Sequence, residues 1–179
     1  MFQPSASAQN WANASASVES TVTFRKELAM DGNLTEPADD GHDHLMDWKL
    51  EVIVVPVSDV DRAKEFYETK MGFGVDVDHR DGDFRVVQLT PPGSGCSISF
   101  GNMINPSEPG TLGGLQIVVS DIEQAHRELR ERGVDIGEIQ HFVHGQPQPG
   151  PDPERAPFNS FLFFADPDGN RWAIQEGMR

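Results

Sequence analysis

Apolar and polar positions along the chain repeat one pattern twice. An apolar strand runs into Ser-Asp and then into a helical pattern at Val57-Ser58-Asp59, and again at Val119-Ser120-Asp121, 62 residues later (121 − 59 = 62). The apolar residues after each Ser-Asp recur at i, i+3, i+4 and i+7, which is the spacing of a helix with one buried face. The chain is therefore predicted to contain one duplicated structural unit. The residues expected on the buried helix faces are Val60, Ala63, Phe66 and Tyr67 in the first copy and Ile122, Ala125 and Leu129 in the second.

The ends of both helices can also be predicted. A Ser at the start of a helix accepts a hydrogen bond from an unpaired backbone amide, while an acid three residues later reaches back to the backbone of the Ser. Glycine ends helices because it readily adopts the left-handed backbone of the C-terminal cap. The expected capping pairs are Ser58 with Asp61 and Ser120 with Glu123, and the expected stops are Gly72 and Gly133.

Three extended segments follow each helix, which makes each copy a βαβββ module. Runs of strand-forming residues bounded by Gly, Pro and Asp turns predict these segments. They are 73–78, 84–90 and 96–100 in the first copy and 135–143, 160–165 and 171–176 in the second. We therefore predict an α+β fold of two tandem βαβββ modules, whose paired mixed sheets form a half-barrel. Repeat one spans residues 48–104 and repeat two spans residues 112–178, within a domain of residues 46–179.

Two segments fall outside the repeated pattern. Residues 1–45 are dominated by Ser, Ala, Asn and Asp, a composition that buries too little apolar surface to offset the loss of chain entropy. This segment is predicted to be a flexible, mostly disordered N-terminal arm. Residues 145–157 (GQPQPGPDPERAP) are predicted to be a Pro-rich loop. Loops of this length are either functional lids or passive surface loops, and both alternatives stay open.

Charge and cysteine content narrow the classes of function. The chain has 14 Lys and Arg against 29 Asp and Glu, and its net charge of −15 repels phosphate backbones and anionic lipids. We therefore expect neither nucleic acid nor a membrane as a partner. The single cysteine, Cys96, allows no intramolecular disulfide. This fits a reducing compartment and predicts a cytoplasmic protein.

Two motifs give the repeat a family resemblance. The first is VPVSDVDRAKEFY at Val55–Tyr67, and the second is FADPDGNRW at Phe164–Trp172. With the repeat, they make residues 48–178 resemble the vicinal-oxygen-chelate superfamily, which includes glyoxalases, bleomycin-resistance proteins and dioxygenases. The resemblance implies a ligand cavity over the concave sheets. It does not imply one activity, because this fold carries lyases, dioxygenases, thiol transferases, epimerases and drug-sequestering proteins.

In metal-dependent members of this superfamily, each repeat supplies two ligands on facing strands. Carried over by position, the resemblance places these ligands at Val52, Gln88, Gly114 and Ala173. Such a set does not form a divalent site, because these ions require imidazole, thiolate or several carboxylate oxygens. We therefore expect no metal and no other cofactor. This expectation argues against metal-dependent glyoxalase and extradiol-dioxygenase chemistry.

Strand alternation gives a set of candidate cavity residues. If Gln88 faces the cavity, then so do Phe84 and Thr90, and if Ala173 faces it, then so do its neighbours two positions away. The expected ligand-binding residues are Phe84, Gln88, Thr90, Arg171 and Gln175.

Two histidines are the candidates for catalysis. His141 and His144 come shortly before and at the start of the Pro-rich region. Imidazole titrates near neutrality, so either residue could act as a general acid or base. The alternative is that both are rim or surface residues.

Two functions therefore remain open. The first is a small-molecule-binding protein similar to bleomycin-resistance proteins, which binds or sequesters a metabolite or drug in the concave sheet cavity. The alternative is a glyoxalase-like lyase or isomerase, or a dioxygenase-type enzyme, that uses side-chain acid–base chemistry or an atypical metal site. Exposed strand edges, which related folds cover by two-fold pairing, predict a homodimer in either case.

Overall fold

The computed structural model describes residues 48–177, so the predicted N-terminal arm, residues 1–45, lies outside the described residues. The first module contains β1 (Val52–Val54), α2 (Val60–Glu65), the π-helical turn η1 (Phe66–Lys70), β2 (Gly74–Asp81), β3 (Phe84–Thr90) and β4 (Ser97–Asn102). The second module contains β5 (Leu115–Val119), α3 (Ile122–Glu131), β6 (Gln140–Val143), β7 (Gln146–Pro149), β8 (Ser160–Ala165) and β9 (Arg171–Glu176).

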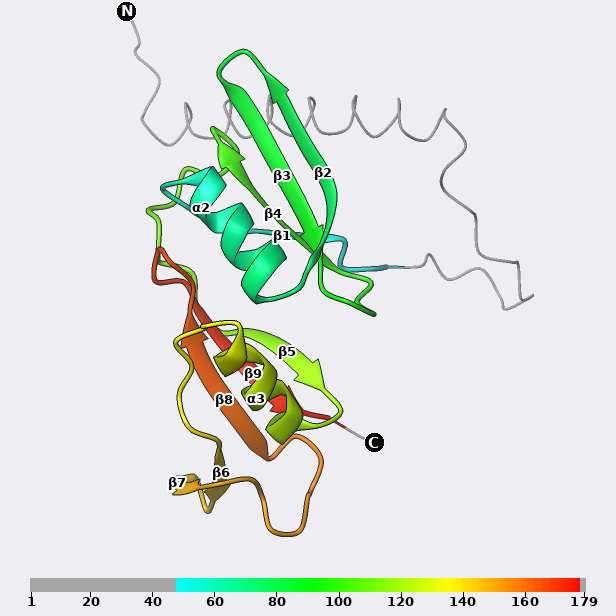
Figure 1. The fold of residues 1–179 in the computed structure, drawn as a ribbon, viewed down its shortest axis with the longest axis vertical. Helices are drawn as coiled ribbons and strands as arrows, with labels where there is room; N and C mark the ends of the chain where they lie inside the picture. Colours follow the sequence, from blue (N-terminus) through cyan, green and yellow to red (C-terminus); the bar gives the residue numbers. More distant parts are fainter. Residues whose placement is uncertain (1–47, 178–179) are drawn as a thin grey trace, which may run out of the picture.

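Each module folds into one mixed sheet with its helix on one side. The strand order is β1-β4-β3-β2 in the first sheet and β5-β9-β8-β6-β7 in the second. β1 and β5 run parallel to their neighbours β4 and β9, whereas the other neighbouring strands are antiparallel. The helices α2 and α3 cover the same side of the two sheets (Figure 1). The predicted α+β fold of two βαβββ modules with mixed sheets is therefore confirmed.

The second sheet has one strand more than the sequence pattern predicts. Gln146–Pro149 forms β7, in which Pro147 lies opposite Phe142 and Pro149 lies opposite Gln140. Prolines are tolerated because β7 is an edge strand, where a missing amide donor can face solvent. The prediction of one continuous loop over residues 145–157 is therefore wrong for its first part. The irregular connection is the segment 150–159, between β7 and β8.

The helices begin one residue later than predicted and end as predicted. Asp59 accepts a hydrogen bond from the Arg62 amide, and Asp121 caps the second helix in the same way. The predicted Ser capping boxes are therefore wrong, because aspartate in the next position is an equally good N-cap. Gly72 and Gly133 adopt φ values of +74° and +72° after the helices. No helix within residues 48–177 is long and apolar enough to cross a membrane.

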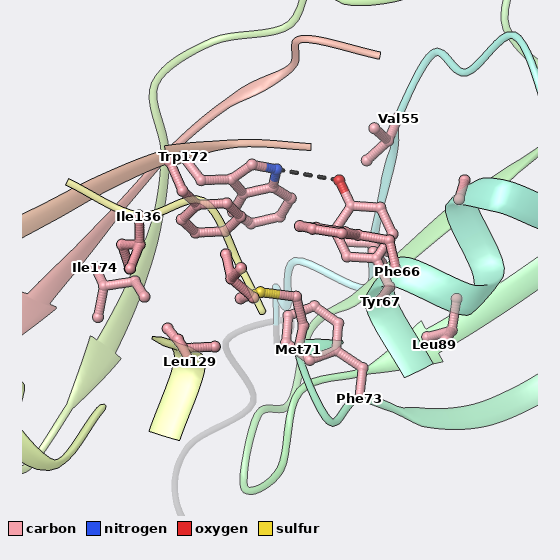
Figure 2. Close-up of a cluster of buried hydrophobic side chains, with 14 of the residues drawn as sticks. Val55, Phe66, Tyr67, Met71, Phe73, Leu89, Leu129, Ile136, Trp172 and Ile174 are labelled. Carbon is pink, nitrogen blue, oxygen red and sulfur yellow. Dashed lines mark hydrogen bonds between the residues drawn. The ribbon is translucent and has the colours of Figure 1, made fainter. Parts of the chain in front are cut away.

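One hydrophobic core joins the two modules. The ring of Tyr67 is fully buried, stacks on Phe73 with 5.7 Å between ring centroids, and meets Trp172 of the second module edge-on at 5.9 Å. Figure 2 shows the Met71 thioether between the first-module side chains and Leu129 of α3. Both sheets thus bury their helix-facing sides, which removes most of their apolar surface from water. The sides of the two sheets that face away from α2 and α3 are not part of this core.

The turn between β8 and β9 adds polar contacts between the modules. Asp166 Oδ2 accepts hydrogen bonds from the Tyr67 hydroxyl at 2.8 Å and from Asn170 Nδ2 at 2.7 Å. The Tyr67 oxygen in turn accepts one from the Trp172 indole N–H at 3.1 Å (Figure 2). Asn170 Nδ2 also donates to the Pro56 carbonyl at 2.9 Å. Burial and the Asp166 carboxylate raise the pKa of Tyr67 far above its usual range, so its hydroxyl remains a donor.

A cluster of charges holds α2 on the first sheet. Arg85 lies on the helix-facing side of β3, where Nη1 contacts Asp61 at 2.6 Å and Nε contacts Asp78 at 3.0 Å. Lys64 Nζ lies 2.9 Å from Asp78 Oδ2. Hydrogen bonds from Arg85, and to a smaller extent from Lys64, lower the pKa of Asp78 to about 2.

We expect the Asp78 interactions to make stability depend on pH in acid. Because the folded-state pKa of about 2 lies below the ordinary value of 3.8, the stabilisation is complete above about pH 5 and is lost as the pH falls through 2. After discounting for solvent screening, it amounts to roughly 1–2 kcal/mol. Urea unfolding of the wild type and of Asp78→Asn measures it as the difference between the two proteins. That difference should shrink between pH 5 and pH 2, and a constant difference would contradict the assignment.

Candidate functional site

The sides of the two sheets that face away from α2 and α3 form the candidate site, and we call them the open faces. Burial alternates along β3, where Val87 and Leu89 are fully buried on the helix side. Phe84, Gln88 and Thr90 alternate with them and are partly exposed. Because successive side chains in a strand point to opposite sides of the sheet, these three residues lie on the open face.

Four side chains form a polar network on the open face of the first sheet. The Thr90 hydroxyl donates to Asp76 Oδ2 at 2.5 Å. Since this hydroxyl carries one proton, the Ser97 hydroxyl is the donor in its 2.7 Å contact with Thr90. Gln88 Nε2 then donates to Ser97 Oγ at 3.2 Å. Each group donates to the next in a chain of hydrogen bonds that ends at the Asp76 carboxylate. This chain sets the orientation of the Gln88 amide.

Three phenylalanines form an aromatic row on the open face of the second sheet. Phe161 and Phe163 of β8 stack with ring centroids 6.1 Å apart and planes 11° apart. Phe142 of β6 meets Phe161 edge-on at 5.4 Å. The ring of Phe163 is 42% exposed. Phe142 and Phe161 are partly exposed, and none of the three rings belongs to the hydrophobic core. Packing of the core is therefore not the role of this row.

Ala173 lies beside the aromatic row. It is opposite Phe163 on one side and Gln116 on the other. Gln175, two positions further along β9, lies opposite Phe161. Ala173 is only 9% exposed, so its larger neighbours cover most of it. The second open face thus places the aromatic row directly beside β9, and aromatic side chains are common in small-molecule sites.

Arg171 and Gln175 lie two positions to either side of Ala173 along β9, on the same open face. The Arg171 side chain is exposed, and a Cβ placed on Gly113 would lie 3.2 Å from its Nη2 atom, so the absence of a side chain there accommodates the guanidinium. None of the ion pairs within residues 48–177 involves Arg171. Gln175 Nε2 donates to the Phe158 carbonyl at 2.8 Å. Arg171 therefore places an exposed positive charge on this face, whereas the Gln175 amide nitrogen is engaged in the protein.

A pocket of about 380 Å³ lies between the adjoining edges of the two sheets. Its walls come from β1, β4, β5 and the turn at residues 91–94, and they include Ser97 of the polar network and Gln116 beside Ala173. The pocket therefore adjoins both open faces. None of the five predicted ligand-binding residues, Phe84, Gln88, Thr90, Arg171 and Gln175, is among the residues that line this pocket.

The two candidate catalytic histidines lie away from the open faces. His141 is buried opposite Ser160, on the helix-facing side of its sheet, and its Nδ1 lies 3.0 Å from the Gly150 carbonyl. His144 is exposed at the turn of the β6–β7 hairpin, where its φ is +50°. The two imidazoles therefore do not converge on Gln88 or on Arg171.

The four positions of the superfamily's metal ligands can now be located. Val52 of β1, Gln88 of β3 and Ala173 of β9 fall on the open faces, and Gly114 directly precedes β5. None of these side chains is an imidazole, a thiolate or a carboxylate. Within residues 48–177, no group of three or more His, Cys, Asp or Glu is arranged to hold a metal ion.

Comparison with known proteins identifies the family. The family model of the Glyoxalase/Bleomycin resistance protein/Dioxygenase superfamily matches residues 43–174. The chain belongs to this superfamily. The resemblance seen in the two motifs and the repeat is therefore confirmed. A search of the curated proteins gave no match.

Solved structures of the superfamily include antibiotic-binding proteins. TnmS3, an antibiotic binding protein from Streptomyces sp. CB03234, is 28% identical, with a TM-score of 0.58 over 75% of this chain and 99% of its own. A glyoxalase/bleomycin resistance protein from the same organism is 28% identical, with a TM-score of 0.55 over 71% of this chain and 99% of its own. A superfamily member from Sphaerobacter thermophilus DSM 20745 is 27% identical, with a TM-score of 0.55 over 74% of this chain and 99% of its own.

Proposed function

We propose that this protein is a non-catalytic binder that sequesters a small planar aromatic molecule on its open faces. The observation that carries the proposal is the aromatic row of Phe142, Phe161 and Phe163, which lies outside the hydrophobic core on the open face of the second sheet. Flat rings stack on exposed aromatic faces with a favourable free energy beyond that of simple burial. The similarity to an antibiotic binding protein supports a binding role.

The local charge favours a neutral or anionic ligand. Arg171 lies two positions from Ala173 along β9 and has no partner among the described ion pairs. Surface charges more than about 8 Å away are largely screened at physiological ionic strength. The net charge of −15 therefore matters less than the nearest guanidinium, which binds carboxylates with good geometry. Gln88 would supply a hydrogen bond from the first sheet.

Two fluorescent probes of equal ring number test this proposal. Anthracene-9-carboxylate is anionic and proflavine is cationic, and each can be titrated with the purified protein. We expect anthracene-9-carboxylate to bind with a dissociation constant in the micromolar range and proflavine about tenfold more weakly or worse. Tighter binding of proflavine would overturn the charge assignment. If neither probe binds, the proposed function is wrong.

Gln88→Ala should weaken anthracene-9-carboxylate binding by about 1–3 kcal/mol, because the ligand oxygen loses its partner in a partly dry site. The fold should lose little stability, since Gln88 is only partly buried. The matched control is Gln148→Ala, which removes an exposed amide from the opposite side of the second sheet. Fluorescence titration of both variants provides the measurement. Equal affinities for both would remove Gln88 from the site.

The enzyme alternative lacks a supporting observation among the described residues. His141 and His144 lie away from both open faces, and the positions of the metal ligands carry Val, Gln, Gly and Ala. We therefore propose no reaction. We place the binder in the cytoplasm because its single cysteine forms no intramolecular disulfide.

We expect a homodimer. The outer edges of the sheets are protected, β2 by charged residues and β7 by its prolines, so edge pairing is not the reason for a dimer. The open faces still expose apolar side chains, among them Val54 and Val118. A second copy of the chain could cover the apolar surface that the bound ligand does not cover. Light scattering at micromolar concentration would measure the mass. A monomer of 19.8 kDa would contradict the expectation.

A further inference from the structure

Phe158 combines an exposed ring with an unfavourable backbone. Its φ is +63°, in the left-handed region that bulky side chains rarely adopt, and its side chain is 46% exposed. A left-handed backbone costs free energy in a residue with a Cβ atom, and it persists only where the surroundings enforce it. Because the ring is exposed, its burial offsets little of this free-energy cost. The conformation therefore needs another explanation.

Contacts with β9 hold Phe158 in this conformation. Its amide donates to the Glu176 carbonyl at 2.7 Å, and its carbonyl accepts from Gln175 Nε2 at 2.8 Å. Arg155 is also left-handed, with φ of +53°. Its guanidinium is paired with Glu123 of α3 and with Glu176, whose side chain is 4% exposed. The segment between β7 and β8 is thus clamped at both residues that carry strain.

The ring of Phe158 lies on the open face of the second sheet. A Cβ placed on Gly177, the residue after β9, would lie 3.7 Å from Phe158 Cε1 and 2.5 Å from Val118 Cγ1. By alternation from Gln175, a side chain at 177 would point to the open face. The ring therefore borders the same surface as Phe161, which lies opposite Gln175.

We propose that Phe158 is a wall of the ligand site, and that the backbone strain is maintained in order to present its ring to the face or edge of a planar aromatic ligand. The inference rests on the proposed function and adds a residue to its site. Arg155 is a positioning residue in this proposal. It does not contact the ligand, and its ion pairs hold the segment that carries Phe158.

The test uses the full chain and anthracene-9-carboxylate. Phe158→Gly removes the ring and the strain together, so the unfolding free energy should stay equal or rise. The affinity for the probe should fall about three- to tenfold. Met103→Gly is the matched control, because Met103 has φ of +68° and is 67% exposed but lies after β4 of the other sheet. It should gain stability to a similar extent without any change in affinity.

The outcomes separate the two proposals. If the wild type does not bind the probe, the proposed function fails and the role of Phe158 fails with it. If the wild type binds and Phe158→Gly binds equally well, only the role of Phe158 is wrong. A marked loss of stability in Phe158→Gly would assign the ring a structural role and would also overturn the inference. Phe158→Asn, which tolerates a left-handed backbone, should reproduce the loss of affinity and so exclude an effect of added chain flexibility.

Discussion

Replacing Asp166 with alanine should lower the free energy of unfolding by about 3–5 kcal/mol, the largest stability effect we expect from a single polar substitution in this chain. The Asp166 carboxylate accepts hydrogen bonds from the backbone amides of Asp168 and Asn170 at 3.0 and 2.9 Å. It also accepts from the Tyr67 hydroxyl and from Asn170 Nδ2. Three of these donors would lose their partner at once, and Asn170 Nδ2 would keep only the Pro56 carbonyl.

The cost is high because the donors cannot turn to water. Tyr67 and Asn170 are fully buried, and Asp166 itself is 5% exposed. A buried polar group without a partner costs about 1–3 kcal/mol, and part of this cost is relieved when neighbours move. The two modules would also lose a contact that ties the β8–β9 turn to η1. Loosening should therefore begin at the boundary between the modules.

Urea unfolding at neutral pH measures this effect, and Asp59→Ala is the control. Asp59 accepts one hydrogen bond at the exposed start of α2, so its removal should cost about 0.5–2 kcal/mol. Asp166→Ala should cost clearly more at an unchanged dependence on urea concentration. If both variants lose the same amount, the network at the module boundary does not hold the modules together.

Residues of the β8–β9 turn show why the fold could be predicted from sequence. Asp166, Asp168 and Asn170 do more than form a hairpin turn, because Asp168 Oδ1 also accepts from the Ser58 hydroxyl at 2.5 Å and from Arg62 at 2.8 Å. The turn motif and the Ser-Asp helix motif are therefore two halves of one contact. Both motifs, set in a repeat, predict the two modules and the buried faces of their helices, but they do not predict β7 of the second sheet.

Local details were less predictable where two residue types serve equally well. Ser58 and Asp59 are both good N-cap residues, and the structure uses Asp59. The Ser58 side chain is instead taken up by Asp168, a contact between residues 110 positions apart. Similarly, the prolines of β7 suggest a loop when the sequence is considered alone. In the structure, β7 pairs with β6 at the edge of the sheet, where proline is tolerated. Such choices depend on tertiary contacts that a local pattern does not contain.

The candidate site was predicted in part. Strand alternation placed Gln88, Arg171 and Gln175 on the sides away from the helices, and the structure has them there; their binding role stays a prediction. The aromatic row was missed, although the alternation in Ser160–Ala165 puts Phe161 and Phe163 on one side. Its contact with Phe142 depends on the pairing of β6 with β8, which sequence order alone does not determine. Phe158 carried no signal, because its left-handed backbone depends on Glu176 and Gln175.

Phe161→Ala should cause the largest loss of ligand affinity, tenfold to about a hundredfold for anthracene-9-carboxylate, or about 1.5–3 kcal/mol. Phe161 is the centre of the aromatic row, since it contacts both Phe142 and Phe163. Its removal deletes one stacking surface and frees the two remaining rings to reorient. The cost of ordering them again then falls on ligand binding.

A control on the same sheet separates this effect from a general loss of stability. Val143 is 45% exposed at the end of β6 and, by alternation from Phe142, points to the other side. Val143→Ala should leave the affinity unchanged, whereas Phe161→Ala should reduce it at temperatures well below unfolding for both variants.

If Phe161→Ala retains the wild-type affinity, the ligand does not stack on this row and the pocket between the sheets would have to bind it alone. If only Gln88→Ala then loses affinity, recognition is polar and belongs to the first sheet. The aromatic row predicts the opposite order, with the Phe161 effect equal to or larger than the Gln88 effect.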